Sequence, residues 1–261
     1  MTTYPNCKIN LGLHVVGKRP DGYHNLETLF LPVHSLKDEL EITTLDSKQG
    51  IVDSTMTQEG IVLDNNPEDN LCMKAWRLLH EEFNIPAVSI RLKKGIPFGA
   101  GLGGGSSDAA FTLKMLNEMF SLGLTDSQLE RLAARLGADC AFFIRNQAAY
   151  ATGIGDILSP IDLDLNAYRF VIEKPEGEHV STKEAYSGLN RDLFGSARPD
   201  LREAVKRPVE EWRDLIVNDF EASVFPCHPA IAALKADMYN RGAVYASMTG
   251  SGAAVFGIFK S

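Results

Sequence analysis

The chain has 261 residues, of which 44% are hydrophobic and 23% are charged, and its formal net charge is −8. This composition is that of an ordinary soluble globular protein and excludes disorder over the chain as a whole. The acidic balance disfavours broad binding to nucleic acid or to an anionic membrane, which needs a basic surface, but it allows a small anionic ligand held by a few local donors.

The N-terminal segment and the cysteines indicate a cytoplasmic protein. The sequence does not open with a basic stretch followed by an apolar block, and no run of about eighteen apolar residues occurs. The four cysteines lie far apart without a C-x-x-C spacing, so reduced thiols are expected in place of disulfides or a zinc site. The histidines show no metal-binding spacing, and the sequence leaves any metal ligands unknown.

Two strands are predicted near the N-terminus. Apolar residues alternate over residues 7–16, which places Lys8 and Asn10 on the same face of the first strand. Turn-forming residues at 17–25 lead to a second strand at 26–33. We therefore expect the two strands to pair in antiparallel fashion.

A third strand, marked by alternating apolar residues in VSIRLKKG at 88–95, precedes the most distinctive segment of the chain. Five of the seven residues from Gly99 to Gly105 are glycine, and the loop runs into a helix predicted from the helical spacing of apolar residues over 109–120. Bare backbone N–H groups and the positive end of a helix together favour a bound phosphate. The loop is therefore predicted to bind a polyphosphate.

The better-known glycine-rich phosphate loops do not fit their context here. Gly99, Gly101 and Gly104 satisfy G-x-G-x-x-G. A dinucleotide-binding fold, however, needs an apolar strand before the loop and an acidic residue at the end of a second strand, whereas Glu118 falls inside the predicted helix. A Walker A loop needs a lysine after its last glycine, and a protein kinase needs V-A-I-K, H-R-D and D-F-G, all of which are missing. A flexible surface loop would not run straight into a capped helix.

The rest of the chain alternates helices and strands. Thr125 and Gln128 form a capping box for a helix that should stop at Gly137. Beyond Asp156 we expect a strand at 168–173, helices at 182–189, 200–207, 209–225 and 229–241, and two strands flanking the turn TGSG at 249–252. Pro160 marks the best boundary between two domains.

Several motifs resemble one enzyme family. PFGAGLGGGSSDAA, residues 97–110, resembles the second motif of the GHMP kinases, and the N-terminal lysine strand and MTGSGAAVF, residues 248–256, agree with that superfamily in order and spacing. Within it, the segments at 5–30, 137–143 and 151–156 are similar to the kinases that phosphorylate the 2-hydroxyl of 4-diphosphocytidyl-2-C-methyl-D-erythritol in the non-mevalonate isoprenoid pathway.

The resemblance implies an α+β, two-domain fold with the active site in the interdomain cleft, an N-terminal domain at 1–156 and a C-terminal domain at 157–261. It implies ATP and Mg²⁺ as cofactors and Lys8 and Asp139 as catalytic residues, with Asp139 orienting or deprotonating the acceptor hydroxyl and Lys8 offsetting charge at the transferred phosphoryl. Cys140 and the alanine after it depart from the Val-Pro of many relatives, which leaves the local backbone open. The ATP loop would comprise Pro97, Gly99, Gly101, Leu102, Gly103, Gly104, Gly105, Ser106, Ser107 and Asp108, with Ser107 a candidate magnesium ligand.

The same resemblance implies the substrate-binding residues. Tyr23 and His24 would hold the cytidine end, since stacking a base on an aromatic ring contributes about 1–3 kcal/mol. Thr182 and Tyr186 share one helical face, with Tyr186 as the opposing ring, although packing of Tyr186 into the core explains it equally well. Asn10 is expected to bond erythritol or phosphate oxygens.

Other interpretations stay open at this point. Without the resemblance, Asp139 could be a helix cap and Lys8 a solvated strand residue, and neither role would involve catalysis. A homoserine or mevalonate type of GHMP kinase would have no use for the aromatic rings, and a non-catalytic nucleotide-binding protein would keep the loop without needing Lys8 or Asp139. The expected partner is a small-molecule cytidine diphosphate derivative. Binding to nucleic acid or to a membrane is not expected, and the protein is expected to be a monomer or a homodimer.

Overall fold

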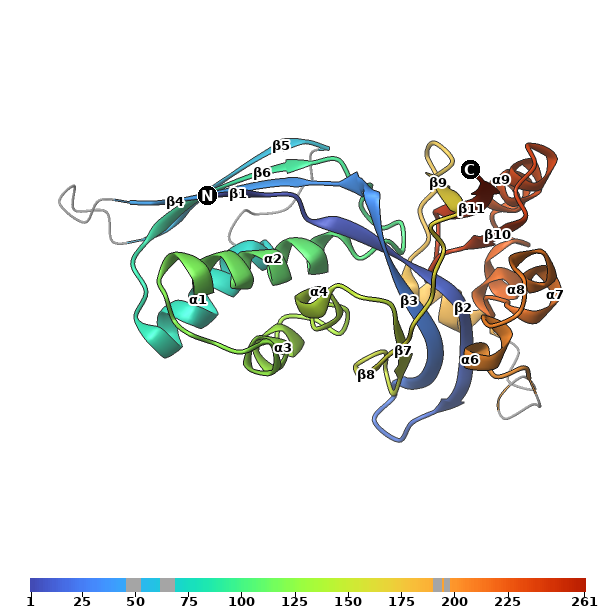
Figure 1. Ribbon diagram of the computed structural model, residues 1–261, viewed down its shortest axis with the longest axis horizontal. Coiled ribbons are helices and arrows are strands. Elements are labelled where there is room, and N and C mark those ends of the chain that lie inside the picture. Colours follow the sequence, from blue (N-terminus) through green and yellow to red (C-terminus); the bar gives the residue numbers. More distant parts are fainter. Residues whose placement is uncertain (46–52, 62–68, 190–193, 195–197) are drawn as a thin grey trace. The chain divides into compact units, whose positions relative to one another are not determined.

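The computed structural model describes two compact units that alternate along the chain (Figure 1). Unit 1 consists of Met1–Cys7, His34–Phe98 and Gly103–Asn146, and unit 2 consists of Lys8–Val33, Gly99–Leu102 and Gln147–Ser261. The residues described are 1–45, 53–61, 69–189, 194 and 198–261.

Unit 1 contains a mixed sheet with helices on one face (Figure 1). Its strand order is β1-β4-β6-β5, and only the β5–β6 pair is parallel among these pairings. The strands are β1 (Thr2–Thr3), β4 (Glu39–Thr44), β5 (Thr55–Gly60) and β6 (Val88–Lys94), and the helices are α1 (Leu71–Phe83), α2 (Gly104–Met119), α3 (Asp126–Ala134) and α4 (Phe142–Arg145).

Two of the unit 1 helices, α2 and α3, form where the local signals predicted them, whereas α1 and α4 were not predicted. The apolar stripe of α2, which includes Ala109, Leu113 and Leu116, is fully buried, as the helical spacing predicted. The capping box of α3 is present at Thr125 and Gln128, but the helix ends at Ala134, before the predicted stop at Gly137. The predicted strand before the glycine loop is confirmed as β6.

Unit 2 holds most of the sheet β2-β3-β7-β8. The strands are β2 (Asn6–Lys18), β3 (His24–Lys37), β7 (Ala149–Thr152) and β8 (Ile157–Pro160), and β7 pairs antiparallel with both β3 and β8. Both N-terminal strands are longer than predicted, and residues 6–15 of β2 are buried on both faces. A charged side chain on this strand is therefore placed in the interior of the protein.

A second sheet of unit 2 supports the C-terminal helices. Its antiparallel order is β10-β11-β9, formed by β10 (Tyr245–Met248), β11 (Val255–Lys260) and β9 (Tyr168–Glu173). The three strands were predicted, but their assembly into one sheet was not. Helix α9 (Pro229–Asn240) packs on this sheet through Ile231 and Met238, which belong to the buried core. Helices α5 (Thr182–Ser187) and α6 (Leu201–Ala204) are shorter than predicted.

The prediction of a single helix over residues 209–225 is wrong. The segment forms three short elements: η4 (Val209–Glu211), α7 (Trp212–Leu215) and α8 (Phe220–Val224). Between them the chain bonds to β2 instead of to itself, because Leu13 N donates to Val217 O and Asp219 N donates to Leu13 O, both at 2.9 Å. Pairing with a strand far away in the sequence thus interrupts an otherwise helical pattern.

The cysteines and the lengths of the helices bear on two expectations from the sequence. All four cysteines are free thiols, and three of them are buried. Over the described ranges, none of the helices has the length and apolar character needed to cross a bilayer.

Candidate active site

Lys8 and Asn10 lie together in the interior of unit 2. Their side chains are on the same face of β2, as the alternation predicted, and they are only 3% and 2% exposed. Lys8 Nζ donates to Asn10 Oδ1 at 2.6 Å and lies 4.8 Å from the centroid of the Phe30 ring. Asn10 Nδ2 in turn donates to Thr28 Oγ1 at 3.0 Å. The alternative of a solvated lysine is therefore wrong, since buried charges are kept only where such donors and acceptors hold them.

The first part of the glycine loop meets this pair in unit 2. Lys8 N donates to Leu102 O at 2.9 Å, and Asn10 N donates to Thr249 Oγ1 at 3.0 Å. Thr249 Oγ1 donates to Gly101 O at 3.3 Å. Gly101 has φ +74°, and a Cβ atom there would lie 2.2 Å from Thr249 O. The lysine strand, the glycine loop and the TGSG turn are thus in direct contact, and only glycine fits at their meeting point.

The second part of the loop starts helix α2 in unit 1. Gly103 is the N-cap with φ 69°, a left-handed conformation that suits glycine. Ser107 and Asp108 follow in the first turns and are 0% and 1% exposed. Among the described residues, the hydroxyl of Ser107 and Oδ1 of Asp108 have no hydrogen-bond partner. Buried polar atoms without partners are rare and need an explanation, such as a ligand.

These orphaned atoms bear on the expected nucleotide and metal. The Ser107 hydroxyl and the unpaired N–H groups at the start of a helix suit a phosphate or a hard cation that accompanies it. Within the residues described, no group of three or more His, Cys, Asp or Glu side chains could hold a metal by itself. The residues present therefore fit a magnesium ion that arrives with phosphates, since Mg²⁺ usually keeps waters and phosphate oxygens among its ligands.

Asp139 is half-buried in the turn between α3 and α4. The N-cap of α4 is Ala141, two residues after Asp139. The neighbouring Cys140 bonds to the Ser106 hydroxyl, and burial raises the pKa of the Cys140 thiol to about 11. A Cβ atom at Gly137 would lie 3.3 Å from Cys140 Sγ and 4.0 Å from Ser106 Oγ. The turn that carries Asp139 is thus held against the first turn of α2.

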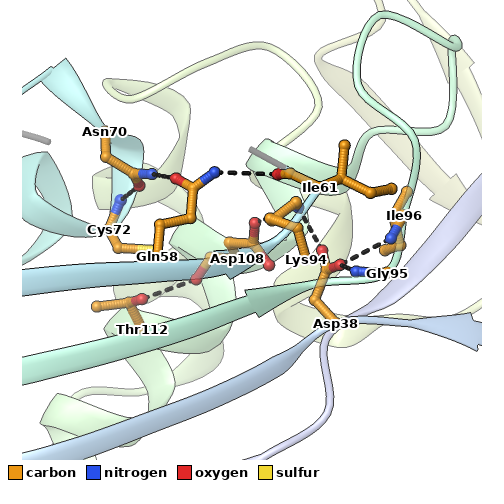
Figure 2. A network of polar contacts seen from close by, with 10 residues as sticks. All are labelled: Asp38, Gln58, Ile61, Asn70, Cys72, Lys94, Gly95, Ile96, Asp108 and Thr112. Atoms are coloured by element: carbon orange, nitrogen blue, oxygen red, sulfur yellow. Dashed lines mark hydrogen bonds and ion pairs between the residues drawn. The ribbon is translucent and has the colours of Figure 1, made fainter. Parts of the chain in front are cut away.

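Sequence reasoning missed a buried ionic network beside the loop in unit 1. Figure 2 shows Lys94 between Asp38 and Asp108; its ammonium bonds to Asp38 Oδ2 and, at 2.7 Å, to Asp108 Oδ2. Burial raises the pKa of Asp108 to about 7, reinforced by the charge of Asp38 and opposed by Lys94. Burial alone would lower the pKa of Lys94, but the two carboxylates outweigh it and raise it.

One signal could have revealed this lysine. Lys94 continues the alternation of Val88, Ile90 and Leu92, so it lies on the face of β6 that is buried against the core. Lys93, one residue earlier, is exposed. A lysine at a core position of a strand requires charged or polar partners.

The residues expected to hold cytidine lie in unit 2. The His24 ring stacks on Tyr186 with centroids 4.5 Å apart and planes at 22°, and Tyr186 contacts Phe220 edge-on at 4.8 Å. Tyr23 is 62% exposed, and the Thr182 hydroxyl lies 3.4 Å from that of Ser251. A pocket of about 230 Å³ beside the stack is lined by Lys18, His24, Lys183, Tyr186, Ser187, Leu189 and Phe194.

The distance between the two stacked rings limits where a base can lie. A separation of 4.5 Å is that of direct stacking, so no base fits between His24 and Tyr186 in this arrangement. Tyr186 also packs against the core of unit 2, which accounts for its partial burial. Tyr23, the residue before His24 in the chain, is largely exposed.

Comparisons with known proteins decide the family. The pattern of the GHMP kinases N terminal domain matches residues 70–147, and that of the GHMP kinases C terminal matches 197–261. A 4-diphosphocytidyl-2-C-methyl-D-erythritol kinase of Bacteroides thetaiotaomicron is 54% identical over 260 residues, which are 100% of this chain and 92% of the relative. The chain belongs to the 4-diphosphocytidyl-2-C-methyl-D-erythritol kinases of the GHMP kinase superfamily.

Solved structures agree with this family and with its fold. A crystal structure of 4-(cytidine 5'-diphospho)-2C-methyl-D-erythritol kinase is 32% identical, has a TM-score of 0.82, and is matched over 99% of this chain and 90% of that one. The mevalonate kinase of Methanococcus jannaschii, 16% identical with a TM-score of 0.73 over 100% of this chain and 90% of its own, shares the fold. The α+β, two-domain GHMP kinase fold expected from the sequence is confirmed.

Proposed function

We propose that the protein transfers the γ-phosphoryl group of ATP to the 2-hydroxyl of 4-diphosphocytidyl-2-C-methyl-D-erythritol, with Mg²⁺, as a step of the non-mevalonate isoprenoid precursor pathway. The observation that carries this proposal is the 54% identity along the whole chain to a kinase named for this substrate. The buried Lys8 beside the glycine loop and the exposed Tyr23 in the turn at 17–25 support it.

The glycine loop and the start of α2 would hold the phosphates of ATP. Backbone N–H groups between Gly99 and Asp108 can converge on phosphate oxygens because five of these residues are glycine. The unpartnered Ser107 hydroxyl would face the metal. A bound Mg²⁺ bridges phosphate oxygens and neutralises charge that develops on them.

Lys8 and Asp139 would act on the acceptor and on the transferred group. Asp139, held at the start of α2 through its neighbour Cys140, would orient the acceptor hydroxyl or accept its proton. Lys8, fixed by Asn10 and the Phe30 ring, would offset charge on the phosphoryl group. Phosphoryl transfer depends mainly on positioning and charge stabilisation, so one carboxylate, one cation and a phosphate cradle are sufficient.

The cytidine end of the substrate would stack on Tyr23. The ring of Tyr23 is exposed, whereas His24 and Tyr186 already cover each other. In this arrangement the His24–Tyr186 stack forms a rigid wall beside the base, and the Thr182 hydroxyl offers a hydrogen bond. Asn10 would bond the erythritol or phosphate oxygens nearer to Lys8.

A phosphorylation assay with several acceptors tests this function. The purified protein is incubated with ATP and Mg²⁺ and, in separate reactions, with the cytidine diphosphate substrate, mevalonate, homoserine or galactose. We expect turnover with the cytidine substrate only. Preference for mevalonate or homoserine would indicate another small-molecule GHMP kinase, and ATP binding without turnover of any acceptor would indicate a non-catalytic nucleotide-binding protein.

Three further properties belong to the same proposal. We propose a cytoplasmic location, a monomer or homodimer, and a division of the sequence between residues 156 and 157 into the two family domains, which differs from the interleaved compact units of the fold. The two matched family patterns, at 70–147 and 197–261, lie on either side of that boundary.

A further inference from the structure

We propose that Lys94 is a positioning residue for the phosphates of ATP, because its ammonium ties the strand that enters the glycine loop to the helix that leaves it. This inference rests on the proposed function only in taking the loop to bind ATP. The contacts that carry it all lie within unit 1.

On the entry side, the network fixes the backbone before the loop. Asp38 Oδ1 accepts hydrogen bonds from Gly95 N at 2.6 Å and from Ile96 N at 2.8 Å, while its other oxygen bonds to the Lys94 ammonium (Figure 2). Asp38 is itself anchored, since its own N–H donates to Pro5 O at 2.8 Å. The path of the chain into Pro97 is therefore set by a buried carboxylate.

On the exit side, the same ammonium reaches the helix that follows the loop. Lys94 Nζ donates to Asp108 Oδ2 at 2.7 Å, and Asp108 is held in the first turns of α2. A Cβ atom at Gly104 would lie 2.9 Å from Ile96 Cγ2 and 3.3 Å from Lys94 Nζ. The first residue of α2 thus packs directly on the residues that precede the loop.

These contacts fix the distance between the two ends of the loop. Its N–H groups can converge on phosphate only if strand β6 and helix α2 keep their relative placement, and a displacement of about 1 Å at a catalytic group can cost about a hundredfold in rate. Buried ion pairs often contribute little to stability compared with apolar residues of similar size. We therefore assign the network a role in geometry more than in stability.

A variant that removes the bridge without leaving a buried charge unpaired tests this role. Lys94→Met combined with Asp38→Asn and Asp108→Asn replaces the ionic network by neutral groups of similar size. The matched control is Lys93→Met, which removes the exposed lysine on the opposite face of the same strand. ATP affinity is measured by calorimetry, together with kinetics for ATP and for the cytidine substrate and with thermal unfolding.

We expect the triple variant to unfold cooperatively, to bind ATP at least about tenfold more weakly, and to keep the KM for the cytidine substrate within twofold, while the control matches the parent. If the triple variant does not fold, Lys94→Arg, which keeps the charge but changes the geometry of the bridge, takes its place with the same expectation. Equal ATP affinity in a folded variant and the parent overturns the inference, as does an equal loss for both substrates.

The calorimetric measurement separates this inference from the proposed function. A parent protein that binds ATP but does not phosphorylate the cytidine substrate contradicts the proposed function, and the role of Lys94 is still decided by the difference in ATP affinity. A parent protein that does not bind ATP contradicts both.

Discussion

Replacing Gly101 by alanine should disable the glycine loop by steric conflict. The new Cβ would lie 2.2 Å from Thr249 O, whereas an ordinary contact begins near 3.4 Å, so the loop or the turn must move by about 1.2 Å. Thr249 is held by Asn10 N, and the displaced atoms are backbone, so the strain cannot be relieved by rotating a side chain. A displacement of this size should lower kcat/KM for ATP by about a hundredfold.

A second glycine provides the control for backbone strain. Gly123 has φ +67°, close to the +74° of Gly101, but no heavy atom lies within 4 Å of a Cβ built there. Both alanine variants should lose about 1–2 kcal/mol of stability from the left-handed conformation, measured by denaturant unfolding. Only Gly101→Ala should also lose activity. Values of kcat/KM for ATP within threefold of each other in the two variants would refute the steric argument.

Three other substitutions address the catalytic group, the substrate site and a half-buried histidine that bonds to two glutamates. Asp139→Asn should lower kcat by at least about a hundredfold with ATP affinity within twofold of the parent, and an unchanged kcat in single-turnover measurements would remove Asp139 from the mechanism. Tyr186→Ala should raise the KM for the cytidine substrate, because the wall beside the base is lost, whereas Tyr186→Phe should not; equal KM values in all three proteins would assign Tyr186 to the core alone. His228→Gln should destabilise the protein in a pH-dependent way: hydrogen bonds to Glu178 and Glu184 raise the pKa of His228 above 6.5, so its contribution is fully present below that pH and is lost as the pH rises through the folded value. The difference in melting temperature should therefore narrow as the pH rises above about 6.5, and a constant difference would contradict the assignment.

The elements that local sequence determines were predictable. Helix α2 follows from its apolar spacing, helix α3 from its capping box, and β9 from a short apolar run between turns. The glycine loop was recognisable because a cluster of glycines indicates a place where the backbone must approach another group closely. For these features the residues that decide the structure lie within a few positions of one another.

Helix α1 was not predicted although its Asn70 cap is a local signal, but other features that the sequence did not reveal depend on distant partners. Lys94 is neutralised by Asp38, which is 56 residues away, so its own strand shows only a polar residue at a core position. Asn10 N bonds to a threonine that is 239 residues away. The helical pattern over 209–225 was likewise broken by Leu13. Hydrophobic periodicity depends only on residues that are close in the sequence, so it cannot predict contacts between residues that are far apart in the sequence.

The four cysteines differ in their accessibility to reagents. Cys7, Cys72 and Cys140 are buried, whereas Cys227, just before α9, is exposed. Burial also raises the pKa of the Cys72 and Cys140 thiols, which lowers the fraction of reactive thiolate. A maleimide dye added to the folded protein should therefore label one position, and unfolding should expose three more, so that alkylation counts the intact molecules in a sample without any engineered tag.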